Sequence, residues 1–226
     1  MKILIGCEES QTVCKSFRNL GYEAYSCDLQ YCSGGHPEWH IMGDVLKIIN
    51  GGEFFTENGL SIKIDKWNLL IGHPPCDFLS NAAARWLYKG GKGELNMARY
   101  EKGLKGKEFF MKLYNAPIDF IALENPIPST VYELPKPTQS IQPYQFGHEF
   151  SKKTNLWLKN LPLLTPTDIK ENHTPFMPSN TGGGKRNQKA TFIYRTKKER
   201  SKTFEGIARA MANQWSKILT PLITKQ

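Results

Sequence analysis

The sequence has 226 residues, of which 39% are hydrophobic and 23% charged, values that suit one globular domain with a sizeable core. It holds no apolar run near the length of about 18 residues that a membrane span needs, and its start, "MKILIGCEES", is too short and too soon acidic for a signal peptide. We therefore expect a cytoplasmic protein without a membrane partner. The net charge of +9 favours a polyanionic partner, with nucleic acid as the first candidate.

The first elements in chain order form a β-α-β unit. Residues 2–7 form an apolar run typical of a buried strand, residues 10–21 carry apolar positions at helical spacing, and residues 22–29 predict a second strand that ends near Asp28. An acid at the end of the second strand is typical of sheets that bind an adenosine ribose, because a carboxylate accepts from both ribose hydroxyls.

The later elements continue the alternation of strands and helices. Apolar runs predict further strands, and two amphipathic stretches predict helices at 96–116 and 203–219. The expected strands lie at 66–76, 118–126 and 154–161, and a short apolar segment at 40–49 contains Asp44. This order predicts an α/β fold with a Rossmann-like, doubly wound and mostly parallel sheet.

We expect residues 1–226 to form a single domain with one excursion. Residues 162–202 are rich in Pro, Thr, Asn and Gly and contain many basic residues, which predicts a long basic loop rather than a second core.

The cysteines do not predict a disulfide framework or a metal site. Their number is odd, so we expect reduced thiols: Cys7, Cys14, Cys27, Cys32 and Cys76. Two of them lie near His36 and His40, but the spacing matches no standard zinc motif, so we expect no metal.

Two predicted strand ends carry the chemistry. One continues into Pro74-Pro75-Cys76, where rigid prolines restrict the backbone before a thiol. The other ends in Glu124-Asn125-Pro126. A thiolate can attack an electrophilic ring carbon, and a neighbouring carboxyl group can exchange a proton with that ring.

Together, "LLIGHPPCDFLS" (69–80) and "ALENP" (122–126) resemble the Pro-Cys and Glu-Asn-Val/Pro motifs of the DNA cytosine-C5 methyltransferases. The whole sequence also resembles small bacteriophage-encoded proteins described as cytosine methyltransferases. The resemblance implies that Cys76 adds to C6 of a flipped-out cytosine, that Glu124 activates the ring, and that C5 then takes a methyl group from S-adenosylmethionine (SAM). It implies that Pro75 shapes the loop and that Asn125 supports Glu124.

The resemblance also implies a cofactor site at the first strand ends. The stretch "ILIGCEES" (3–10) occupies the place of the family's first SAM motif, which implies SAM contacts from Gly6, Glu8 and Pro74. Asp28 would bind the ribose, and Asp44 would meet the adenine amine. The family's paired glycines are reduced to one in this stretch.

On the substrate side, the resemblance implies that DNA is the partner and that Lys153 and Ser80 help to hold the base. Lys185 and Arg186 in the basic loop could bind phosphates. The loop is short for a target-recognition domain, so we expect relaxed specificity or a substrate smaller than duplex DNA.

Three alternatives remain open. The same covalent chemistry could act on RNA or on a free pyrimidine nucleotide. The chain could instead be a catalytically inactive nucleic-acid binder with a methyltransferase fold. Methylation of an amino group fits less well, since such enzymes use Asp/Asn-Pro-Pro-Tyr/Phe where this chain has His73 to Cys76.

Overall fold

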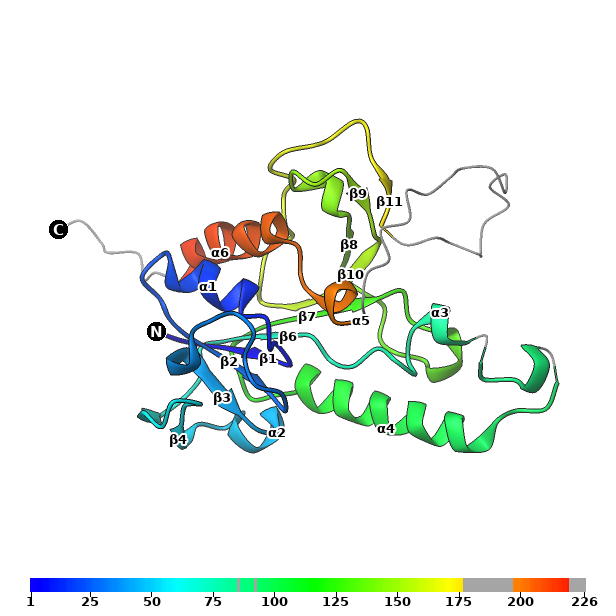
Figure 1. Ribbon diagram of the computed structural model, residues 1–226, viewed down its shortest axis with the longest axis horizontal. Helices are drawn as coiled ribbons and strands as arrows, with labels where there is room; N and C mark the ends of the chain where they lie inside the picture. Colours follow the sequence, from blue (N-terminus) through cyan, green and yellow to red (C-terminus); the bar gives the residue numbers. More distant parts are fainter. Residues whose placement is uncertain (85, 92, 177–196, 220–226) are drawn as a thin grey trace.

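The computed structural model describes residues 1–84, 86–91, 93–176 and 197–219 (Figure 1). In these residues a seven-stranded sheet has the order β3-β2-β1-β6-β7-β10-β8. Its strands are β1 (Lys2–Gly6), β2 (Glu23–Asp28), β3 (His40–Met42), β6 (Leu69–Gly72), β7 (Phe120–Pro126), β8 (Gln139–Ile141) and β10 (Thr154–Lys159). Of these seven described strands, β10 runs opposite to the others, since it pairs antiparallel with both β7 and β8.

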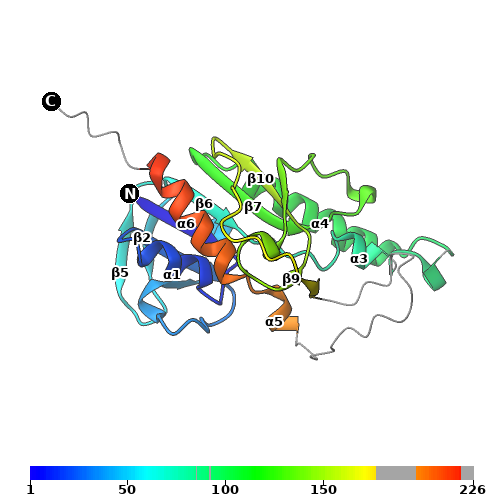
Figure 2. The same ribbon diagram turned by 90° about the horizontal axis from the view of Figure 1, so that it is seen from above.

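Helices cover both faces of this sheet, as Figures 1 and 2 show. The described helices are α1 (Thr12–Arg18), α2 (Val45–Ile48), α3 (Asn81–Ala84), α4 (Met97–Tyr114), α5 (Lys197–Ser201) and α6 (Glu205–Leu219). Short 3-10 turns are η1 (Pro37–Trp39), η2 (Lys89–Gly91), η3 (Thr130–Tyr132) and η4 (Pro143–Gln145). The prediction of a doubly wound, mostly parallel α/β sheet is therefore confirmed.

The two faces have separate apolar cores because neighbouring strand residues point to opposite sides. From β1, Ile3 and Ile5 pack with α1 and α6, whereas Leu4 packs on the other face with α2 and α4. Burial of α6 follows its apolar stripe, since Met211 and Trp215 are fully buried.

Several elements lie outside the predicted pattern. A hairpin of β4 (Gly52–Phe55) and β5 (Ser61–Ile64) follows α2, and β9 (Phe150–Ser151) pairs with β11 (Thr174–Pro175). The predicted basic loop at 162–202 therefore contains β11 and α5 where the structure describes it. Near the C-terminal end of α6 the apolar stripe reaches the surface, since Ile218 is 41% exposed.

The strand order places the candidate site. The chain moves outward from β1 to β2 and β3, then returns to β6 on the other side of β1 and continues to β7. The change of direction lies between β1 and β6, and ligands of such sheets bind at the carboxyl ends of the strands beside that point. We call these carboxyl ends the strand tips.

Candidate active site

The two predicted catalytic motifs lie side by side at the tips of β6 and β7. These strands pair in parallel, with Gly72 opposite Leu123, so Glu124 lies one residue past the end of the ladder. The side-chain amide of Asn125 donates to the carbonyl of Pro74 at 3.2 Å. This bond ties the loop that carries Cys76 to the tip that carries Glu124.

Glu124 is paired with His73, a residue to which the sequence reasoning gave no role. Nδ1 of His73 lies 2.9 Å from Oε2 of Glu124, and the two side chains are 11% and 16% exposed. Burial lowers the pKa of His73, but the hydrogen bond and charge of Glu124 outweigh it and raise that pKa above its ordinary value. Burial raises the pKa of Glu124, but His73 and Lys152 outweigh it and hold that pKa below its ordinary value. Each partner of the pair therefore favours the charged form of the other.

Cys76 is half-buried next to this pair. Burial raises the pKa of its thiol, the charges of Asp77 and Glu124 raise it further, and Lys152 opposes them. The thiol is thus protonated in the free protein at neutral pH, and attack requires it to lose that proton.

Lys152 is a site residue that the sequence reasoning missed. Its Nζ donates to the carbonyl of Arg200 at 2.8 Å and lies 5.6 Å and 5.8 Å from the ring centres of Phe176 and Phe204. A small hollow brings its side chain beside Glu124, with Phe204 in the same wall. Lys152 therefore adds a positive charge beside Glu124, and it lowers the pKa of Glu124 less than His73 does.

The predicted base-holding residue was Lys153, which lies exposed. Side chains of a strand alternate between faces, so counting back by two from Leu156 through Thr154 reaches Lys152 rather than Lys153. This alternation is the signal that could have identified Lys152.

The tips of β1, β2 and β3 bring two of the predicted cofactor residues together. Asp28 ends β2, and Asp44 caps α2 by accepting from the N–H of Leu46 at 3.0 Å. Burial is the largest cause that raises the pKa of the nearby thiol of Cys7 to about 12, and the charges of Asp28 and Asp44 are the next largest. Two carboxylates beside the switch point suit hydroxyl and amine donors, so this set fits the adenosine half of a nucleoside cofactor.

Glu8 has a partner other than the expected cofactor. Its carboxylate is buried and accepts from the N–H groups of Val13 at 2.6 Å and Cys14 at 3.2 Å. Burial raises the pKa of Glu8, while the charge of His73 lowers it. Glu8 thus accepts hydrogen bonds from N–H groups in the first turn of α1. Its neighbour Glu9 accepts from the hydroxyl of Ser33.

The remaining predicted residues divide by location. Gly6 ends β1, and Pro74 is buried, whereas Pro75 is exposed on the Cys76 loop. The N–H of Ser80 donates to the carbonyl of Cys76 at 3.1 Å, which closes the loop after the thiol. Lys185 and Arg186 lie outside the described residues.

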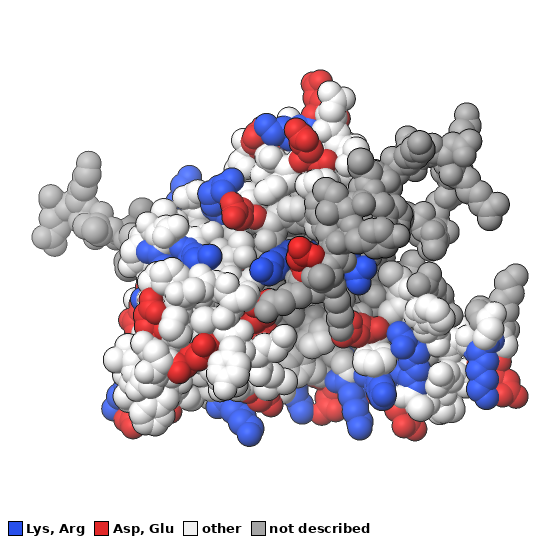
Figure 3. All heavy atoms as spheres, in the orientation of Figure 1, with Lys and Arg blue, Asp and Glu red and all other residues white. Residues whose placement is uncertain are grey.

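Charges alternate over the face drawn in Figure 3. Blue and red side chains stand side by side along its lower edge, where α4 lies in Figure 1. On α4 itself the exposed lysines Lys102 and Lys105 lie in sequence between the exposed acids Glu101 and Glu108. The described part of the chain contains no group of three or more metal-ligating side chains, and none of its helices is long and apolar enough to span a membrane.

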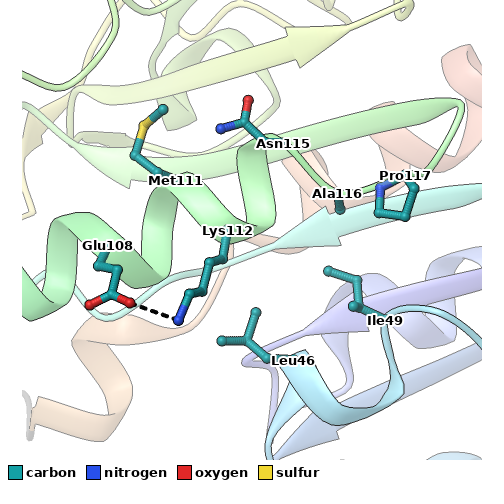
Figure 4. A pocket seen from close by; sticks show the side chains of 8 residues that line it. All are labelled: Leu46, Ile49, Glu108, Met111, Lys112, Asn115, Ala116 and Pro117. Atoms are coloured by element: carbon teal, nitrogen blue, oxygen red, sulfur yellow. Dashed lines mark ion pairs between the residues drawn. The ribbon is translucent and has the colours of Figure 1, made fainter.

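A larger groove of about 490 Å³ lies between α2 and the end of α4 (Figure 4). Apolar side chains line it, including Leu46, Ile49 and Met111, together with the ion pair of Lys112 and Glu108 at 2.7 Å. It borders the start of β7, whereas Glu124 lies near the other end of that strand. The groove has no nucleophile, so we do not assign the chemistry to it.

No protein-family model matches the chain, and no curated protein matches it. Among solved structures, the chain is similar to an E. coli prophage protein described as a DNA modification methyltransferase, with 13% identity and a TM-score of 0.43. The match covers 75% of this chain and 52% of that one, so the chain spans about half the length of that protein. A likeness at this level bears on neither family nor activity.

Proposed function

We propose that the protein is a SAM-dependent methyltransferase that transfers a methyl group to C5 of cytosine in DNA through a covalent adduct with Cys76. The observation that carries the proposal is the union of the two motifs: the tie from Asn125 to Pro74 holds the loop of Cys76 against the tip of Glu124. A thiol and a carboxyl group on adjacent strand tips are what the covalent chemistry needs. The doubly wound sheet is of the type expected for such an enzyme.

In this mechanism the thiolate of Cys76 attacks C6 of a cytosine that has left the base stack, since C6 cannot be reached within a duplex. Glu124 hydrogen-bonds the ring edge and passes a proton to it. Lys152 favours the thiolate, because its charge lowers the pKa of Cys76, and it faces the developing charge on the ring. The buried setting strengthens these interactions because it excludes water.

The cofactor would be held by the tips of β1 to β3. Asp28 would accept from ribose hydroxyls, and Asp44 from the adenine amine. When bound, SAM supplies the methyl group that C5 takes. Gly6 at the end of β1 is the single glycine of this stretch, and Glu8 binds the first turn of α1, so the methionine half would be held by other groups of the β1–α1 loop.

Trapping the adduct tests this proposal. DNA that contains 5-fluorocytosine is incubated with the protein and SAM labelled in its methyl group, and denaturing gels report covalent complexes. We expect an adduct with the wild-type protein and none with Cys76→Ala or with SAM left out, because fluorine at C5 blocks release only after methyl transfer. Failure of the wild-type protein to form the adduct, with no SAM binding by calorimetry, would contradict the proposal.

A further inference from the structure

His73 is the buried titratable group of the site that the proposed mechanism does not use. Its backbone N–H donates to the carbonyl of Gly6 at 2.9 Å, which fixes the residue at the switch point between β1 and β6. Its ring is held through Nδ1 by Glu124. Nε2 is buried and has no hydrogen-bond partner within the part of the chain that the structure describes. Among the described residues, the His73 ring is thus held by a hydrogen bond at Nδ1, to the carboxylate of Glu124.

Three charged groups face His73 from the elements packed around it. Glu8 approaches from the β1–α1 loop, Glu124 from β7, and Lys152 from the segment after β9. Two carboxylates against one ammonium favour a charged imidazole. The pair of His73 and Glu124 therefore holds one labile proton between two buried side chains.

We propose that His73 stores the proton that Glu124 delivers to N3 of the pyrimidine ring when Cys76 adds to C6. This inference rests on the proposed function and deepens it by assigning the source of the proton. His73 is a positioning residue in this scheme, since it acts on the ring only through Glu124. Its single hydrogen bond suits the task, because the ring can give up its Nδ1 proton and remain a neutral Nε2–H tautomer without reorienting.

The step balances in atoms and electrons. As the bond from Sγ to C6 forms, the C5–C6 double bond shifts to C4–C5, and the electron pair of the C4–N3 double bond moves onto N3. N3 takes a proton from Glu124, which takes the Nδ1 proton of His73. When C5 gains the methyl group, the C4–C5 pair makes the new bond and the pair on N3 re-forms the C4–N3 double bond. A base then removes the C5 proton, the C5–C6 double bond re-forms, and the thiolate leaves. N3 then returns its proton through Glu124 to His73.

The scheme predicts a particular pH profile. Addition needs the thiolate of Cys76, whose fraction grows with pH, and the charged form of His73, which is present below its pKa and lost above it. The scheme requires the pKa of the thiol to lie above that of the imidazole, and between these two pKa values the two changes cancel. The adduct rate of the wild-type protein should rise with pH up to the pKa of His73 and then level off.

The test measures single-turnover rates of adduct formation from pH 5.5 to 9 for the wild-type protein and His73→Gln. Glutamine keeps an N–H for Glu124 but cannot store a proton. We expect His73→Gln to be about 10- to 100-fold slower at pH 6 and to keep rising with pH where the wild-type rate is level. His36→Gln is the matched control, because His36 also contacts a glutamate, Glu38, through Nδ1 at 2.9 Å but lies at the surface. It should keep the wild-type profile.

A profile of His73→Gln that levels off like the wild type would overturn the inference. NMR of the free protein gives a second readout that needs no substrate: the His73 ring, assigned from the signal lost in His73→Gln, should titrate above 6.5 and lower in Glu124→Gln. A His73 ring that stays neutral from pH 5.5 to 9 would also overturn the inference. If the wild-type protein forms no adduct while His73 titrates as expected, the proposed function fails and the charged pair stands.

Discussion

At the scale of single residues, the site combines a suppressed thiol with a charged pair. Burial, Asp77 and Glu124 keep Cys76 protonated, so the free protein carries a weakly reactive thiol. Lys152 is the neighbour that works against this suppression. The reactivity of the Cys76 thiol should therefore depend on Lys152.

Replacement of Lys152 tests that dependence. Lys152→Met keeps an unbranched apolar stem against Phe176 and Phe204 but removes the charge that lowers the pKa of Cys76. We expect the adduct rate at pH 7 to fall by about tenfold, equivalent to a change of about 1.4 kcal/mol. Alkylation of Cys76 by iodoacetamide, followed by peptide mass spectrometry, should slow in parallel.

The neighbouring lysine provides the comparison. Lys153→Met removes an exposed charge one position along the chain, where solvent screens its effect on Cys76. A larger loss of rate in Lys153→Met than in Lys152→Met would restore the assignment made from the sequence and contradict the one made from the structure.

These residues show how far sequence reasoning reached into the site. Cys76 and Glu124 were identifiable because Cys76 follows an apolar strand, Glu124 lies near the end of another, and each belongs to a recognisable motif. His73 and Glu124 are 51 positions apart, and their pairing depends on the parallel register of β6 and β7, which local patterns do not reveal. The choice between Lys152 and Lys153 depended on which side of β10 faces α6.

At the scale of elements, the turn that follows β7 packs closely against α4. The 3-10 turn η3 follows the tip of β7 and places Tyr132 against α4. Tyr132 stacks on Tyr100 with ring centres 5.8 Å apart, and Gly103 lets the ring approach the helix backbone. The close contact of α4 with η3 therefore requires a residue without a side chain at position 103.

Alanine at this glycine should destabilise the protein although alanine favours helices. A Cβ at Gly103 would lie within 2.3 Å of two ring atoms and the hydroxyl oxygen of Tyr132, which the stack on Tyr100 keeps from moving aside. The clash should cost about 1–3 kcal/mol, more than the gain of about 1 kcal/mol from helix propensity. We expect the free energy of unfolding in urea to fall.

Gly106 in the same helix is the matched control. A Cβ there would lie 3.3 Å from Cγ of Leu79 and farther from its two methyl groups, a much looser approach than the one at Gly103. Gly106→Ala should leave the stability near the wild-type value or raise it slightly. A Gly103→Ala variant as stable as Gly106→Ala would show that Tyr132 does not pack as described.

The elements also divide by how well the sequence predicted them. Long apolar or periodic segments gave β1, β2, β6, β7, β10 and the helices α1, α4 and α6, because burial on one or both faces leaves a clear pattern. The hairpin of β4 and β5 was missed, since its strands are short and half exposed. The strand β8 was also missed, because it has three residues and is defined by its pairing with β10.

At the scale of the whole molecule, one sheet brings two candidate half-sites to a single edge. The tips of β1 to β3 carry the carboxylates suited to an adenosine, and the tips of β6 and β7 carry Cys76 and Glu124. The switch point lies between the halves, and His73 stands there, within the field of Glu8 on one side and Glu124 on the other. A methyl donor and a base bound at this edge would meet over β1 and β6.

The most direct test of this account identifies the modified atom. Unmethylated DNA is incubated with the protein and SAM carrying a trideuterated methyl group, then digested and separated as nucleosides by mass spectrometry. The account predicts label on 5-methyl-2′-deoxycytidine with the wild-type protein and none with Cys76→Ala. Label on an exocyclic amine, as N4-methylcytosine or N6-methyladenine, or label on no nucleoside at all would contradict it.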